Sequence, residues 1–102
     1  MSADADPPSP EALQRLADGF ASLATEIERG RPERVLLDTM RRAQELASEA
    51  AAGQRGERQA LLLNVATALT TWQDVWPRLS AQREFRLAVA REARLWAKRF
   101  GD

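Results

Sequence analysis

Residues 10–30 read PEALQRLADGFASLATEIERG, and this stretch shows the helical pattern of the chain most clearly. Its large apolar residues recur every three or four positions: Leu13, Leu16, Phe20, Leu23 and Ile27. Such spacing places them on one face of a helix and the polar residues on the other. Ser9 suits an N-cap, Pro10 a first helical turn and Gly30 a left-handed C-terminal cap. We therefore predict an amphipathic helix over residues 10–29.

The same reasoning predicts helices over residues 33–52, 57–75 and 80–99. Pro32 can begin a new helix directly after Gly30, and the residues from Gly53 to Gly56 form a turn. Two further apolar faces are Leu36, Met40, Ala43, Ala47 and Ala50, and then Leu62, Val65, Leu69, Trp72 and Trp76. We expect Leu16, Phe20, Leu69 and Trp72 to form the centre of the core.

The apolar pattern changes phase near Pro77. It resumes as Phe85, Val89, Ala93, Trp96 and Phe100. Proline disfavours the helical conformation of the residue before it and lacks a backbone donor. We therefore predict a break or sharp kink at residues 76–80, with Ser80 as an N-cap. A full reversal and a kinked continuous helix both remain open.

Composition favours an all-α fold. The 102 residues include 19 Ala and 13 Leu but only five Gly and five Pro, and Ala and Leu are strong helix formers. We expect a small antiparallel bundle of three to four helices in one domain over residues 9–102, after a disordered tail at residues 1–8. The sequence has neither a membrane-spanning apolar run nor the pattern of a signal peptide, so we expect a cytoplasmic protein without membrane insertion.

Charge is distributed unevenly along a chain whose formal net charge is zero. Residues 1–30 carry six acidic and two basic side chains, whereas residues 78–99 carry seven basic and two acidic ones. Opposite charges attract, so we expect these two parts to pair within the bundle or between antiparallel copies.

The residue types disfavour an enzyme. The chain contains no His, Cys or Tyr, so neither a Ser-His nor a Cys-His pair can form and any metal site would be built from carboxylates alone. The acidic pairs Glu26 with Glu28 and Glu45 with Glu49 fall on predicted outer faces, and no Gly-rich phosphate loop is present. We predict no catalytic residue, no metal and no cofactor.

Two kinds of binding surface can be identified. The off-pattern residues Leu37, Leu63 and Leu87, with the large rings of Trp72 and Trp76, predict contact with a protein partner or a second copy of the chain. We therefore favour a non-enzymatic scaffold or protein–protein interaction module, either a homodimer or a subunit of a larger complex. Core packing of the tryptophans is the alternative.

The alternative function uses the basic face of the last predicted helix, which would bind nucleic acid or another acidic surface. This face comprises Arg83, Arg86, Arg91, Arg94 and Lys98. A solvated face, neutralised in part by the acidic first helix, would carry the same residues. The zero net charge favours this second interpretation.

Overall fold

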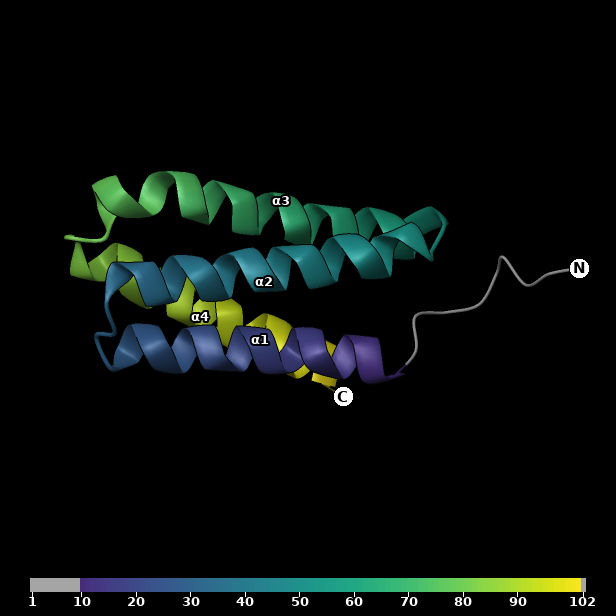
Figure 1. Ribbon diagram of the computed structural model, residues 1–102, viewed down its shortest axis with the longest axis horizontal. Helices are drawn as coiled ribbons and strands as arrows, with labels where there is room; N and C mark the ends of the chain where they lie inside the picture. The colour runs from purple at the N-terminus through teal and green to yellow at the C-terminus, as the bar shows by residue number, and fades with distance from the viewer. Residues whose placement is uncertain (1–9, 102) are drawn as a thin grey trace, which may run out of the picture.

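The computed structural model describes residues 10–101, and within that range the chain forms four helices and no strand. They are α1 (Pro10–Glu28), α2 (Glu33–Ala52), α3 (Gly56–Leu79) and α4 (Arg83–Gly101). Successive helices run antiparallel (Figure 1), so the predicted all-α bundle is confirmed. The predicted N-cap at Ser9 and the predicted tail at residues 1–8 lie outside the described residues.

The first two turns follow the predicted pattern. Gly30 has φ of 67°, and the Arg31 N–H donates to the Glu26 carbonyl at 3.0 Å, which closes the end of α1. Gly56 has φ of 68° at the start of α3. Glycine adopts this left-handed conformation without steric cost, and the chain therefore turns tightly at both places.

The chain also reverses near Pro77, but α3 continues through the proline to Leu79. The predicted end at residue 75 was too early because Pro77 lies in the last turn, where it removes one backbone hydrogen bond and little helix follows. Ser80 is not an N-cap. It is the C-cap of α3, and its N–H donates to the Trp76 carbonyl at 2.9 Å.

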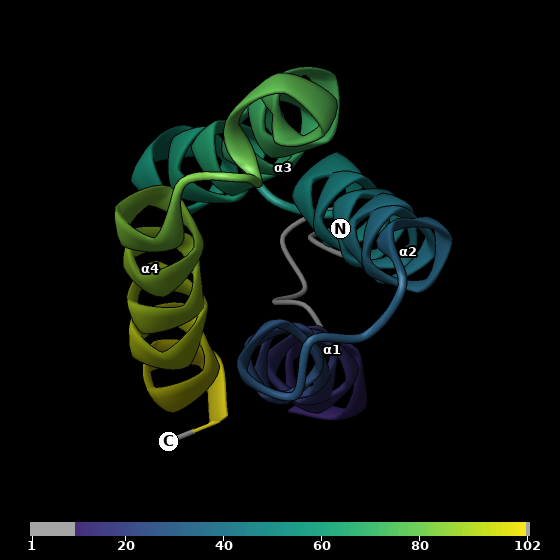
Figure 2. The ribbon, with the colours of Figure 1, turned by 90° about the vertical axis from the view of Figure 1, so that its left-hand side faces the viewer.

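The four helices surround a common core but do not pack equally closely. α4 packs mainly on α1, and α3 mainly on α2, whereas α3 and α4 approach each other little. Figures 1 and 2 show why: α4 begins beside the end of α3 and then diverges from it toward the start of α1. The α3–α4 side of the bundle is therefore splayed.

Small residues explain the closer contacts. A Cβ atom on Gly101 would lie 3.5 Å from the Cβ of Ala17, and one on Gly19 would lie 3.6 Å from the Cβ of Ala43. Helix backbones can approach closely where such side chains meet. α4 and α2 therefore both lie close against α1.

The core confirms most of the predicted apolar faces. Leu16, Phe20 and Leu69 are fully buried, as are Met40, Ala43 and Ala47 of α2. The prediction that Trp72 lies at the core centre was wrong. Trp72 is half-buried because its side of α3 faces the splayed region, whereas Trp76, near the turn, is only 1% exposed.

None of the helices in residues 10–101 is both long enough and apolar enough to cross a lipid bilayer.

Leu69→Ala tests the core assignment. Leu69 is fully buried, so we expect the free energy of unfolding to fall by about 2–5 kcal/mol through lost transfer energy and the resulting cavity. Leu63, on the same helix, is 48% exposed, and Leu63→Ala should cost less than about 0.5 kcal/mol. Urea denaturation followed by circular dichroism measures both. Equal losses would show that the faces of α3 are misassigned.

Candidate interaction surface

Phe20 of α1 lies between α3 and α4. Its ring centroid is 6.5 Å from that of Trp72 on α3, in an edge-to-face arrangement. On the other side it is 6.4 Å from Trp96 and 6.5 Å from Phe100, both on α4. A buried aromatic ring thus occupies the space where α3 and α4 would otherwise touch. Nearer the turn, Trp76 and Phe85 meet directly at 5.5 Å.

Beyond Phe20, toward the open end of the bundle, the two helices leave a cleft of about 660 Å³. We call this the α3–α4 cleft. Its apolar lining comprises Leu13, Ala60, Leu61, Leu62 and Phe100. Leu62 is buried and Ala60 is exposed, while Leu13, Leu61 and Phe100 are half-buried, so apolar surface here remains accessible to a partner.

Charged and polar side chains form the rest of the lining. Glu57, Arg58 and Asn64 come from α3, and Arg99 comes from α4. The Arg99 guanidinium also lies 5.7 Å from the centroid of the Trp96 ring, which favours a cation over the aromatic face. Each wall of the cleft therefore carries charge above an apolar floor.

The predicted interface residues do not form one surface. Leu37 is half-buried and packs against the core, and buried Trp76 is not available to a partner. Leu63 and Leu87 are exposed, as expected. Trp72, half-buried beside Phe20, is the predicted residue closest in character to the cleft lining.

Leu63 and Leu87 point in different directions. Leu63 lies on the side of α3 that carries Gln59 and Gln73, which both bond to α2. Leu87 lies on the outer face of α4. Leu95, 60% exposed, shares that outer face and was missed by the sequence analysis. Isolated exposed leucines are common on soluble proteins, so these three do not identify an interface.

The predicted basic face is partly used by the fold itself. Arg86 donates from Nη1 to the Ser80 carbonyl at 2.6 Å, which fastens α4 to the preceding turn. Arg94 makes a two-pronged ion pair with Glu28 of α1, in which Nε donates to Oε2 at 3.1 Å and Nη2 donates to Oε1. Arg83, Arg91 and Lys98 are exposed.

The Arg94–Glu28 pair joins the basic and acidic parts of the chain, as the charge distribution predicted. The hydrogen bond from Arg94 lowers the pKa of Glu28 below its ordinary 4.5, outweighing the opposite effect of desolvation, and the positive charge of Arg94 adds to it. The same hydrogen bond and charge raise the pKa of Arg94. Both side chains stay about half exposed, so solvent screens much of this attraction.

The interior offers little for chemistry. The buried residues in the described part of the chain are apolar, and none of its acidic side chains gather in a group that could hold a metal ion. Glu26, predicted to face outward, accepts a hydrogen bond from Thr39 of α2 at 2.7 Å. Shape and apolar surface are therefore what the α3–α4 cleft provides.

Sequence reasoning missed Leu61 and Phe100 as cleft residues. Phe100 was placed on the apolar face of its helix, and Leu61 lies one position before that of α3. Their partial exposure depends on how far apart α3 and α4 are. A single apolar pattern describes one helix and carries no information on that spacing.

No protein-family model, curated protein or solved structure matches this chain significantly, and its function must therefore be inferred from the geometry above.

Glu28→Gln tests the ion pair between α1 and α4. Because the folded-state pKa of Glu28 is lowered, the ionised carboxylate stabilises the fold above about pH 4.5, and this contribution is lost as the pH falls through the folded-state value. We expect the variant to unfold at a lower urea concentration than the wild type at pH 7, and the difference to disappear near pH 2.

Glu45→Gln is the matched control, because it removes one negative charge from an exposed position of α2. Its urea midpoint at pH 7 should stay close to that of the wild type. An identical midpoint for Glu28→Gln at pH 7 would contradict a stabilising role for the pair.

Proposed function

We propose that this protein is a non-enzymatic helical interaction module that associates with a second copy of itself through the α3–α4 cleft. The observation that carries the proposal is the accessible apolar lining between two splayed helices. Covering apolar surface is worth about 25 cal/mol per Å² removed from water. A partner that fills the cleft would gain this energy.

Charge favours a second copy as the occupant. The chain has a formal net charge of zero, so two copies approach without long-range repulsion. A twofold contact also requires one surface to be complementary to itself. The cleft meets this requirement, since Glu57 lies on its α3 wall and Arg99 on its α4 wall.

A twofold axis parallel to the cleft gives the arrangement we favour. Such an axis sets α3 of one copy over α4 of the other and aligns the same ends of the two bundles. Glu57 then faces Arg99 of the partner subunit, twice per dimer. The apolar floors of the two clefts cover each other between these pairs.

Sedimentation equilibrium tests this association. We expect a dimer with a dissociation constant at or below about 100 μM, equivalent to about −5.5 kcal/mol. Leu61→Glu puts a charge into the cleft and should raise the dissociation constant by at least about tenfold, because burying an unpaired charge is costly. Leu63→Glu makes the same change on the other side of α3 and should leave the constant unchanged. Circular dichroism verifies that both variants fold.

A charge exchange tests the twofold arrangement itself. Arg99→Glu should weaken the dimer by opposing Glu57 of the partner subunit, and adding Glu57→Arg to the same chain should restore it. A wild-type monomer at every concentration contradicts the proposal. So does a dimer weakened equally by Leu61→Glu and Leu63→Glu, and docking of another protein's helix would then be the remaining use of the cleft.

A further inference from the structure

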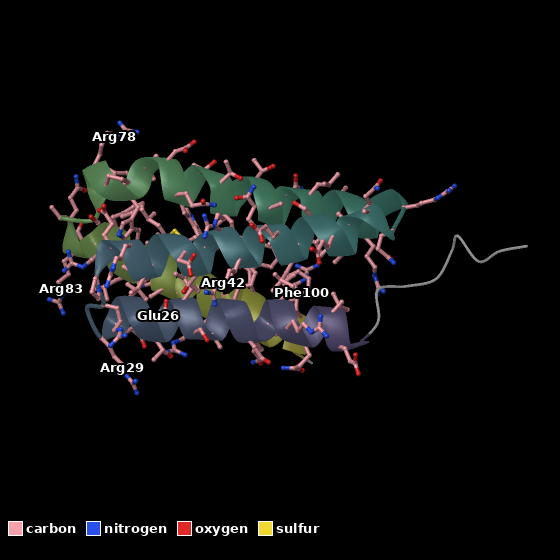
Figure 3. The ribbon with its side chains drawn as sticks, in the orientation of Figure 1. Glu26, Arg29, Arg42, Arg78, Arg83 and Phe100 are labelled. Carbon is pink, nitrogen blue, oxygen red and sulfur yellow. The ribbon has the colours of Figure 1, made fainter. Side chains whose placement is uncertain are left out.

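The two reversals at residues 29–32 and 80–82 lie at the same end of the bundle, opposite the wide end of the α3–α4 cleft (Figure 1). Five arginines gather around them from separate parts of the chain, and we call this surface the arginine end. Its members are Arg29, Arg31, Arg34, Arg78 and Arg83. Figure 3 shows Arg29, Arg78 and Arg83 projecting away from the helices at this end.

These arginines are exposed and take no part in the ion pairs found within residues 10–101. Those pairs use Arg41 and Arg42 with Asp38, and Arg94 with Glu28. The acidic groups nearest the five arginines are therefore either already paired, as Glu28 and Asp38 are, or lie in the first turns of α2 and α4, as Glu33 and Glu84 do. The arginine end keeps an excess of positive charge on a protein whose net charge is zero.

The chemistry of this surface favours phosphate. Arginine binds phosphate oxygens through two parallel N–H donors, and several such contacts suffice for binding to a nucleic-acid backbone without base contacts. Acidic protein surfaces and membranes are usually held by large apolar side chains in addition to charge. The exposed apolar residues of these turns are small, namely Pro32, Pro77 and Ala81.

We propose that the arginine end binds the phosphate backbone of double-stranded nucleic acid without sequence preference. This surface differs from the basic face predicted from the sequence, with which it shares only Arg83. It combines both turns, and residues more than 40 positions apart in the chain meet there. The proposal stands on its own and does not depend on the α3–α4 cleft.

Fluorescence anisotropy with a labelled duplex of about 20 base pairs tests the inference at about 50 mM salt. We expect a dissociation constant between about 1 and 100 μM, the usual range of non-specific binding. The logarithm of the affinity should fall with the logarithm of the salt concentration, with a slope of about −0.9 per phosphate contact. Five contacts would give a slope of about −4.5.

The double variant Arg29→Glu with Arg83→Glu should lose at least about tenfold in affinity and reduce the slope by about 1.8. Arg55→Glu with Arg58→Glu is the matched control. It changes the net charge equally, but at the opposite end of the bundle and again at exposed residues. This control should keep most of the affinity and the full salt slope.

Two results would overturn the inference. One is the absence of binding at about 100 μM protein, or equal losses in the two double variants, which would indicate a general charge effect. The other is binding to phosphatidylserine vesicles without binding to the duplex, which would assign the arginine end to a membrane surface.

Discussion

The bundle depends on the position of Phe20. Its ring is buried against Trp72 on one side and against Trp96 and Phe100 on the other, so α4 is joined to the rest of the bundle through α1 and only weakly through α3, its neighbour in sequence. Large rings hold α3 and α4 apart, while Ala17 opposite Gly101 lets α1 and α4 approach closely. The sizes of side chains at each contact therefore decide which pair of helices opens.

Electrostatics act in the same direction as packing. α1 comes from the acidic part of the chain and α4 from the basic part, and the Arg94–Glu28 pair joins them. Because the pair is half exposed, it contributes less to stability than the buried rings do. Its effect is on register: the forked guanidinium fits the carboxylate in one orientation, so it fixes how far α4 is shifted along α1. That shift in turn sets where Phe100 lies at the mouth of the α3–α4 cleft.

Much of this fold could be predicted from the sequence, and the reasons for the failures are specific. The apolar faces of α1 and α2 were predicted correctly because each is a local pattern with Gly and Pro at its ends. Trp72 and Trp76 share one such pattern, yet Trp76 is buried and Trp72 only partly so, since their burial depends on the distance to α4. Arg29 and Arg78 were missed as partners for the same reason: they meet only when both turns lie at one end of the bundle. Sequence periodicity describes single helices, whereas both proposed surfaces depend on the relation between helices.

The two proposed surfaces lie at opposite ends, and neither blocks the other. In a dimer with its twofold axis along the cleft, both arginine ends point in the same direction. A nucleic-acid duplex long enough to reach both would then meet two linked binding sites, and the second contact would form at an effective concentration of the order of millimolar. A site that is weak in one copy would thereby become useful in the pair. Self-association at the cleft would thus control the strength of phosphate binding at the other end, and a short duplex that reaches only one site would not sense it.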